Sequence, residues 1–161
     1  GKTLAVGSAN FPRYDLDDVS QPVPYYQVNV YSLNEENNLW EPLGSTLYGS
    51  RTNVQDNFGG SLAFNSDGTI LVVGASLDSS VGVENGRVST YQLVKLEGEN
   101  DTLVEEWVPY VDDLTGAPGS ELGSSIDTLP SGDHLLVGAP LSNPNGEDSG
   151  EAFLYSLAGM S

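Results

Sequence analysis

The stretch Leu71–Leu77, with the sequence LVVGASL, decides the fold because it recurs as LVGAPL at Leu136–Leu141 and more loosely as LAVGSA at Leu4–Ala9. The central glycines of the three copies lie 67 and 64 residues apart. Each copy is a short run of apolar and β-branched residues, which is typical of a strand that is buried on both faces. Recurrence at a nearly constant spacing predicts an array of similar supersecondary units.

Other segments recur in the same order along the chain. A segment with the pattern Tyr-x-Leu occurs three times, a segment that begins with Trp occurs twice, and a Phe-Gly or Leu-Gly segment occurs twice. Their positions are Val28–Leu33, Val88–Leu93, Ala152–Leu157, Trp40–Leu43, Trp107–Tyr110, Phe58–Ala63 and Leu122–Ile126. Turn sequences such as Ser66-Asp67-Gly68 and Asn145-Gly146 separate these segments. No stretch has the periodicity of a helix, so each segment is predicted to be a short strand.

We therefore predict an all-β fold of β-propeller-type blades, each built from four antiparallel strands. Repeat one (1–56) is partial because it lacks a Phe-Gly strand, repeat two (57–120) is complete, and repeat three (121–161) is partial because it lacks a Trp strand. The strands number three, four and three, which makes about two and a half blades, whereas a closed propeller has about four to eight. The array is not expected to close by this chain alone.

Three arrangements account for an incomplete array. The sequence is a fragment of a larger propeller, or a subunit whose sheets are completed by neighbouring copies in a ring or filament, or a self-contained sandwich with a different strand count. Exposed edge strands pair readily with other chains. We therefore expect the partners to be other copies of the chain or the rest of a larger propeller.

The signature residues of the repeats are Trp40, Trp107, Tyr31, Tyr91, Tyr155, Phe58, Gly59, Gly74, Ala75, Gly123, Gly138 and Ala139. Their pattern resembles the FG-GAP repeat family, which builds β-propellers such as the integrin α-subunit head. It is closest to a branch found in secreted and surface proteins of microbes and algae. The resemblance implies an extracellular or cell-surface location, but it is weak evidence for function because propellers host many activities. We expect the two tryptophans to serve in blade packing.

The resemblance also suggests calcium as a cofactor, because the family binds Ca²⁺ in an Asp-x-Asp-x-Asp-Gly loop before the Val-Gly strand. Ca²⁺ prefers six to eight oxygen ligands, and the matching loop here offers only Asn65 and Asp67. Loops after the Val-Gly strands contribute a second set of candidate ligands: Asp15, Asp17, Asp18, Asn145, Glu147 and Asp148. The alternative, which we favour, is an ordinary Asp-Gly turn and solvated acidic loops.

The chain of 161 residues carries 23 acidic and 5 basic residues, a net charge of −18. This charge argues against binding to nucleic acid or insertion into an anionic membrane surface. Cysteine is absent, which excludes disulfides and thiolate chemistry. All five basic residues precede residue 96, so a head-to-tail contact between copies is expected to place basic segments against acidic ones.

His134 is the only imidazole of the chain. Ser131 and Asp133 are its neighbours, but adjacent residues of a strand point to opposite faces, so we expect no catalytic relay and a structural role. Asn100 begins an N-glycosylation sequon, Asn-Asp-Thr, and is the candidate site for an N-glycan in a secreted protein.

These features predict a non-enzymatic extracellular module with a structural or adhesive role. It is expected to be a subunit of a homopolymeric filament or part of a larger surface protein, with its incomplete blades completed by a neighbouring chain. Two alternatives remain open: a calcium-dependent ligand-binding adhesion propeller, and a hydrolase built on a propeller scaffold.

Overall fold

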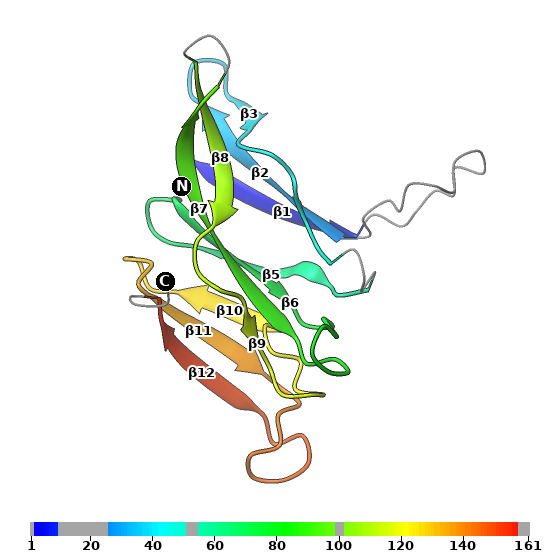
Figure 1. Ribbon diagram of the computed structural model, residues 1–161. Coiled ribbons are helices and arrows are strands. Elements are labelled where there is room, and N and C mark those ends of the chain that lie inside the picture. Colours follow the sequence, from blue (N-terminus) through cyan, green and yellow to red (C-terminus); the bar gives the residue numbers. More distant parts are fainter. Residues whose placement is uncertain (1, 10–25, 51–54, 99–101, 158–161) are drawn as a thin grey trace, which may run out of the picture.

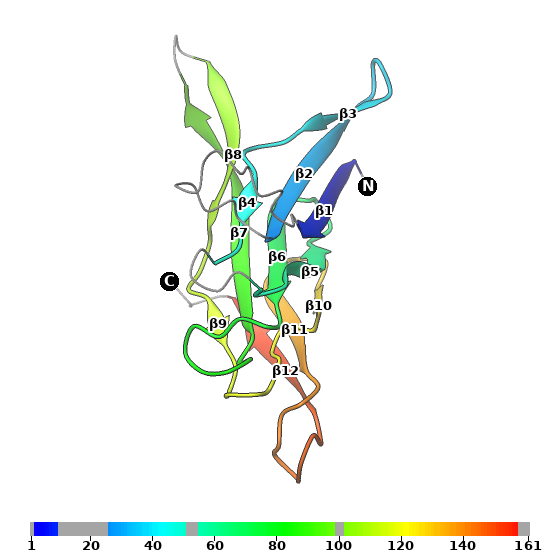
Figure 2. The ribbon, with the colours of Figure 1, turned by 90° about the vertical axis from the view of Figure 1, so that its right-hand side faces the viewer.

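The computed structural model describes residues 2–9, 26–50, 55–98 and 102–157, and the regular structure in these ranges consists of twelve β-strands without a helix. All strand pairs are antiparallel, and they form three sheets that follow one another in chain order (Figures 1 and 2). The three sheets do not close into a ring. The predicted all-β, propeller-like and unclosed architecture is therefore confirmed. The described residues include no helix long and apolar enough to cross a membrane.

The N-terminal sheet has the strand order β1-β2-β3, and a short strand β4 also pairs with β2. Its strands are β1 (Thr3–Ala9), β2 (Tyr26–Asn34), β3 (Leu39–Pro42) and β4 (Leu47–Tyr48). The central sheet has the order β5-β6-β7-β8, with a short strand β9 beside β7. Its strands are β5 (Phe58–Phe64), β6 (Ile70–Ala75), β7 (Arg87–Glu97), β8 (Leu103–Pro109) and β9 (Leu114–Thr115).

The C-terminal sheet has the order β10-β11-β12. Its strands are β10 (Ser125–Thr128), β11 (His134–Ala139) and β12 (Glu151–Ser156). The two-residue strands β4 and β9 come in addition to the predicted ten strands. They pair with β2 and β7 beyond the ends of β3 and β8, so each is a continuation of the Trp strand after a break.

The central and C-terminal sheets share one register. Val72 pairs with Thr90 and Gly74 with Val88 in the central sheet. Leu136 pairs with Leu154 and Gly138 with Ala152 in the C-terminal sheet. Because the side-chain period of a strand is two, equal registers place equivalent residues on equivalent faces. Residues of different sheets can therefore be compared position by position.

Two apolar cores hold the three sheets together. The first lies between the N-terminal and central sheets and contains Val28, Val30, Leu43, Leu47, Phe58, Leu71, Val73, Ala75 and Trp107. The second lies between the central and C-terminal sheets and contains Ile70, Val72, Val88, Leu122, Leu135, Val137, Ala139 and Leu157. Each fully buried aliphatic side chain contributes roughly 1.5–3 kcal/mol, so contact between sheets is the main source of stability.

Strand β6 lies between the two cores, and all six of its residues are buried. Leu71 and Val73 face the first core, whereas Ile70 and Val72 face the second. This alternation explains why the sequence of β6 is a continuous apolar run, because a strand covered on both faces has no position for a polar side chain.

Glycine at the Val-Gly position allows neighbouring sheets to approach closely. A Cβ built on Gly7 would lie 2.2 Å from the carbonyl oxygen of Gly59, and one built on Gly74 would lie 2.3 Å from that of Gly123. In the C-terminal sheet, the atom nearest to a Cβ on Gly138 would be the side-chain hydroxyl of Ser125 in its own sheet, at 2.4 Å, and the nearest backbone atom would lie 3.7 Å away. Gly7 and Gly74 therefore face the following sheet, whereas the equivalent Gly138 faces no following sheet among the described residues.

This difference predicts unequal effects of the same substitution. Gly74→Ala is expected to lower the free energy of unfolding by about 1–3 kcal/mol, because the new methyl group collides with backbone that cannot rotate away. Gly138→Ala is expected to lower it by less than about 1 kcal/mol, because the Ser125 hydroxyl can change rotamer. Chemical denaturation of the two variants measures both values, and equal losses would contradict the assigned close approach.

Candidate functional site

The N-terminal sheet exposes the face that points away from the central sheet. Leu4 and Val6 of β1 lie on that face, and each is 42% exposed. The equivalent residues of β6, Leu71 and Val73, are fully buried against the N-terminal sheet. The exposed pair therefore resembles the residues that form contacts between sheets. Among the described residues, however, no sheet packs against it. We call the surface formed by Leu4 and Val6 the N-face.

The two tryptophans occupy equivalent positions but different environments. Trp107 of β8 is 4% exposed, donates its indole N–H to the Leu43 carbonyl oxygen at 3.0 Å, and contacts the Phe64 ring. Its packing between sheets is the role expected from the repeat. Trp40 of β3 is 45% exposed. If another sheet packed against the N-face, Trp40 would be placed to contact it as Trp107 contacts the N-terminal sheet.

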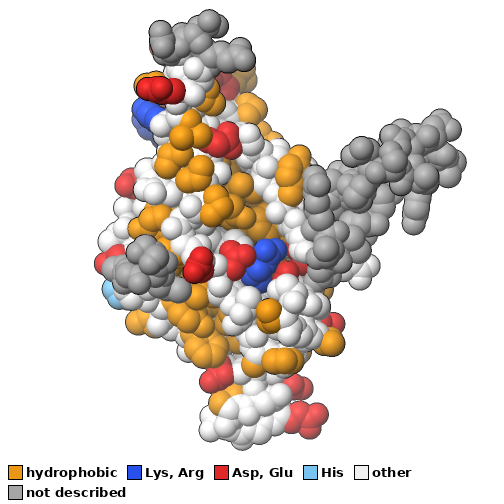
Figure 3. All heavy atoms as spheres, viewed as in Figure 1, with side chains coloured by type: hydrophobic (Ala, Val, Ile, Leu, Met, Phe, Trp, Pro, Cys, Tyr) orange, Lys and Arg blue, Asp and Glu red, His pale blue; other side chains and the backbone are white. Residues whose placement is uncertain are grey.

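The C-terminal sheet also exposes the face that points away from the central sheet, which corresponds to the other side of a sheet-to-sheet contact. Leu136 of β11 is 49% exposed and Leu154 of β12 is 67% exposed. Their equivalents in the central sheet, Val72 and Thr90, are 0% and 3% exposed because the C-terminal sheet covers them. Hydrophobic side chains reach the surface in both the upper and lower halves of the molecule (Figure 3). We call the surface formed by Leu136 and Leu154 the C-face.

The terminal sheets also have open strand edges. The described part of the N-terminal sheet begins at β1 and has no counterpart of β5 or β10, the inner strands of the other two sheets. As far as residue 157, the last described one, the C-terminal sheet ends at β12 and has no counterpart of β3 or β8, the outer strands of the other two sheets. Within the described ranges, both edges therefore present backbone groups that can pair with another strand.

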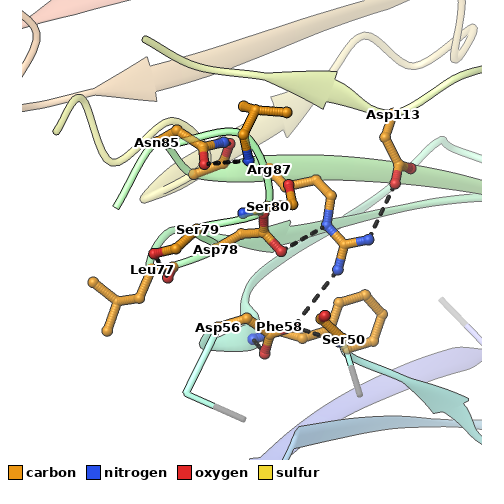
Figure 4. Close-up of polar contacts among 12 residues, drawn as sticks. Ser50, Asp56, Phe58, Leu77, Asp78, Ser79, Ser80, Asn85, Arg87 and Asp113 are labelled. Atoms are coloured by element: carbon orange, nitrogen blue, oxygen red, sulfur yellow. Dashed lines mark hydrogen bonds and ion pairs between the residues drawn. The ribbon is translucent and has the colours of Figure 1, made fainter. Parts of the chain in front are cut away.

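A buried ionic cluster lies where the start of β7 meets the segments before β5, after β6 and after β8. Arg87 at the start of β7 lies 3.3 Å from Asp78, 3.5 Å from Asp56 and 3.1 Å from Asp113. Figure 4 shows the guanidinium group between the three carboxylates. Asp56 and Asp78 are 1% and 0% exposed. Arg87 therefore neutralises two carboxylates that water does not reach.

The surroundings of Asp56 have opposing effects on its pKa. Burial raises the pKa of Asp56, whereas hydrogen bonds from the backbone N–H groups of Ser50 and Phe58 and the charge of Arg87 lower it, and burial has the larger effect. Asp56 precedes β5 and bonds to Ser50 after β4, so the cluster ties the N-terminal sheet to the central one. Its chemistry is that of a structural clamp.

The repeat pattern did not reveal this cluster. The positions equivalent to Arg87 are Gln27 in the first repeat and Glu151 in the third. In the third repeat Glu151 accepts a hydrogen bond from the Ser142 hydroxyl. The clamp is thus particular to the central sheet. Its signal in the sequence is a basic residue in a strongly acidic chain, because Arg87 is one of 5 basic residues against 23 acidic ones.

The candidate calcium residues of the β5–β6 turn bind the turn itself. The Asn65 side-chain oxygen accepts hydrogen bonds from the N–H groups of Thr69 and Ile70, at 3.0 and 2.9 Å. Asp67 accepts hydrogen bonds from both the N–H and the hydroxyl of Thr69, and these bonds lower its pKa. Both side chains thus act as in an ordinary Asx-stabilised turn.

The other candidate ligands that the structure describes lie in a different loop. Asn145, Glu147 and Asp148 lie exposed in the β11–β12 loop, where the Asp148 N–H donates to the side chain of Asn143. Asp15, Asp17 and Asp18, as well as the sequon residue Asn100, lie outside the described residues. The part of the chain that the structure describes holds no group of three or more His, Cys, Asp or Glu side chains placed to bind a metal.

His134 makes a contact that the strand rule did not anticipate. Its Nδ1 lies 3.0 Å from a carboxylate oxygen of Asp133, and the same oxygen accepts a hydrogen bond from the Ser131 hydroxyl. The expectation that neighbouring side chains point apart is wrong here because β11 begins at His134, so Asp133 still belongs to the turn. These two contacts lower the pKa of Asp133. Serine and histidine both contact the carboxylate, which is not the order of a catalytic triad.

The remaining signature residues line the contacts between sheets. Phe58, Ala75 and Ala139 are buried in the cores, and Tyr91 and Tyr155 pack against them. Tyr31 of β2 is partly buried and pairs with Leu4. No family model matches the chain, and neither does any curated protein. The candidate functional site is therefore defined by the geometry itself: two apolar end faces and two open strand edges.

Proposed function

We propose that the chain is a non-enzymatic structural or adhesive module, built from FG-GAP-like repeats, that works at the cell surface or outside the cell as part of a larger assembly. The observation that carries this proposal is the incompleteness of both terminal sheets. Among the residues that the structure describes, each terminal sheet lacks a strand that the central sheet has, and each exposes apolar residues whose equivalents are buried. A repeat of this kind buries its faces only by stacking on neighbours.

The physical cost of the isolated chain supports an assembly. Leu4, Val6, Leu136 and Leu154 are all more than two-fifths exposed, and burial of the part that is still exposed would contribute roughly 1 kcal/mol for each side chain. The open edges of β1 and β12 would gain backbone hydrogen bonds from an added strand. A neighbouring chain in a filament, or another part of a larger surface protein, satisfies both demands at once.

Mass measurement tests the proposal. Sedimentation velocity of the chain from about 1 μM to about 1 mM, the range of weak to moderate affinity, is expected to show species above the monomer mass of 17.0 kDa. The measurement is made at low and at high salt, because the net charge of −18 repels copies and salt screens that repulsion. A monomer over the whole range, at low and high salt, would contradict self-assembly.

Electron microscopy of the associated sample distinguishes a filament from a ring. Contacts between unlike surfaces of identical subunits produce rings when the rotation between subunits closes and filaments when it does not. Either form supports the proposal. Amorphous aggregates that bind a dye for exposed apolar surface would contradict it, because a specific contact between folded sheets buries the apolar faces.

A further inference from the structure

We propose that the C-face of one copy binds the N-face of a second copy, head to tail, in the same way that successive sheets bind within the chain. This inference rests on the proposed function and assigns the surfaces that carry it. The C-face contains Leu136 and Leu154, and the N-face contains Leu4 and Val6. The contact would bury the four exposed side chains together.

The internal interfaces provide the precedent. At the first interface, Val28 and Val30 of the N-terminal sheet pack against Leu71 and Val73 of β6. At the second, Val72 and Val88 of the central sheet pack against Leu135 and Val137 of β11. In both interfaces, the face of one sheet that points toward the C-terminal sheet packs against the opposite face of the next sheet. The next sheet contributes a Leu-x-Val pair each time, Leu71 and Val73 or Leu135 and Val137. The chain contains two examples of a single kind of contact.

Each terminal sheet presents one side of this kind of contact without a partner sheet among the described residues. Leu4 and Val6 stand where Leu71 and Val73 stand in β6, and where Leu135 and Val137 stand in β11. At the other end, Leu136 stands where Val72 stands, in the same register with its neighbouring strand. The two open faces are hence unlike each other and correspond to the two sides of an interface that the chain already forms twice.

A second copy is the occupant that these observations favour. It is the one partner whose sequence is known to carry the matching half, and an unlike pair of faces on one molecule gives a head-to-tail contact. A contact of a face with its own kind would place Leu136 on Leu136, which neither internal interface resembles. The proposal therefore predicts directional association.

The junction between copies differs from the internal ones in one respect. At both internal interfaces, the following sheet contributes an inner strand, β5 or β10, to the contact, and the Ser61 hydroxyl donates to the Gly123 carbonyl oxygen at 2.6 Å. The N-terminal sheet has no such strand among the described residues, so Ser125 would find no equivalent acceptor. We therefore expect the junction to be weaker than an internal interface and concentration-dependent.

Engineered cysteines test the direction of the contact, because the chain has no cysteine of its own. Leu136→Cys and Val6→Cys, mixed on chains of different mass and treated with a flexible bis-maleimide, are expected to yield mainly the mixed dimer. Val83→Cys is the control, because Val83 is 74% exposed and lies in the β6–β7 loop, outside the strands β1, β11 and β12 that form the two faces. Mixed product at the level of the Val83→Cys control, or a Leu136→Cys homodimer as the main product, would overturn the assignment.

A loss-of-contact variant separates this inference from the proposed function. The double variant Leu136→Glu with Leu154→Glu is expected to weaken self-association at least about tenfold, because docking would bury two added charges. Val81→Glu with Val83→Glu is the matched control, since both residues are highly exposed loop positions, and it is expected to associate as the unaltered chain does. An unchanged thermal midpoint shows that each variant is folded.

The outcomes are distinct. Association of the unaltered chain that is lost in the Leu136→Glu and Leu154→Glu variant supports both the function and the faces. Association that persists unchanged in that variant overturns the assigned faces and leaves assembly through the open edges in place. A strictly monomeric unaltered chain overturns the assigned contact between copies and the filament form of the proposed function. The cysteine pair then decides the direction of the contact independently of its strength.

Discussion

Arg87→Ala is expected to lower the free energy of unfolding by about 3–5 kcal/mol, because breaking a buried ion pair leaves an uncompensated charge. Asp56 and Asp78 are almost completely inaccessible to water, and Arg87 lies within 3.5 Å of both. Urea denaturation measures the loss. Arg87→Lys keeps the charge but not the planar fork of donors, so its loss is expected to be smaller.

The loss is expected to depend on pH. Burial already raises the pKa of Asp56, and removal of the guanidinium group would raise it further. A carboxyl group whose pKa is higher in the folded than in the unfolded state destabilises the folded state once it ionises, so stability falls as the pH rises through the folded-state pKa. The difference between Arg87→Ala and the unaltered chain should therefore shrink as the pH is lowered toward the ordinary aspartate range.

Lys95→Ala is the matched control for Arg87→Ala. Lys95 forms an ion pair with Glu105 at 3.8 Å, and both side chains are well exposed, at 67% and 43%. Such pairs contribute about 0–1 kcal/mol, so this variant should unfold nearly as the unaltered chain does. Comparable losses for the two variants would show that the Arg87 cluster is solvated in solution and is not a buried clamp.

Trp107→Ala is expected to cost about 3–5 kcal/mol, the usual range for loss of a buried aromatic side chain. The substitution would empty a position in the first core and leave the Leu43 carbonyl oxygen without its indole donor. Trp107→Phe retains most of the packing and removes the N–H, so about 1 kcal/mol is expected for that variant.

Trp40→Ala is the control that the repeat itself offers. Trp40 occupies the same position in the N-terminal sheet but is 45% exposed, and its loss is expected to cost less than about 1 kcal/mol in the monomer. Thermal unfolding of dilute samples compares the two variants. Equal losses for both tryptophans would contradict the assigned packing of Trp107 between sheets.

The repeat signatures predicted the strands because the responsible forces are local. The apolar run of β6 predicts a strand covered on both faces, and all six of its residues are buried. The glycines and Asx residues between segments predict turns, and the β5–β6 turn is closed by the side chains of Asn65 and Asp67. In such segments, the residues that define the local structure are neighbours in sequence.

The same signatures did not predict which equivalent residues are buried. Trp40 and Trp107 occupy equivalent positions of the repeat, yet among the described residues only Trp107 has a sheet to pack against. Likewise, Val72 is buried whereas Leu136 is not. The burial of these side chains depends on whether their repeat has a neighbour on that side, and the sequence of a single repeat does not indicate this. The contact between Asp133 and His134 was missed because the exact start of β11 decides it.

The amino-acid sequence by itself determined the all-β class, the order of the repeats and an array too short to close, because hydrophobic alternation and turn chemistry act over a few residues. The tertiary structure alone decided which faces remain open and how charges are neutralised. Arg87 meets Asp56 and Asp78 only after three loops converge. The N-face and C-face exist because sheets stack in one direction, which leaves one unlike surface at each end of the stack.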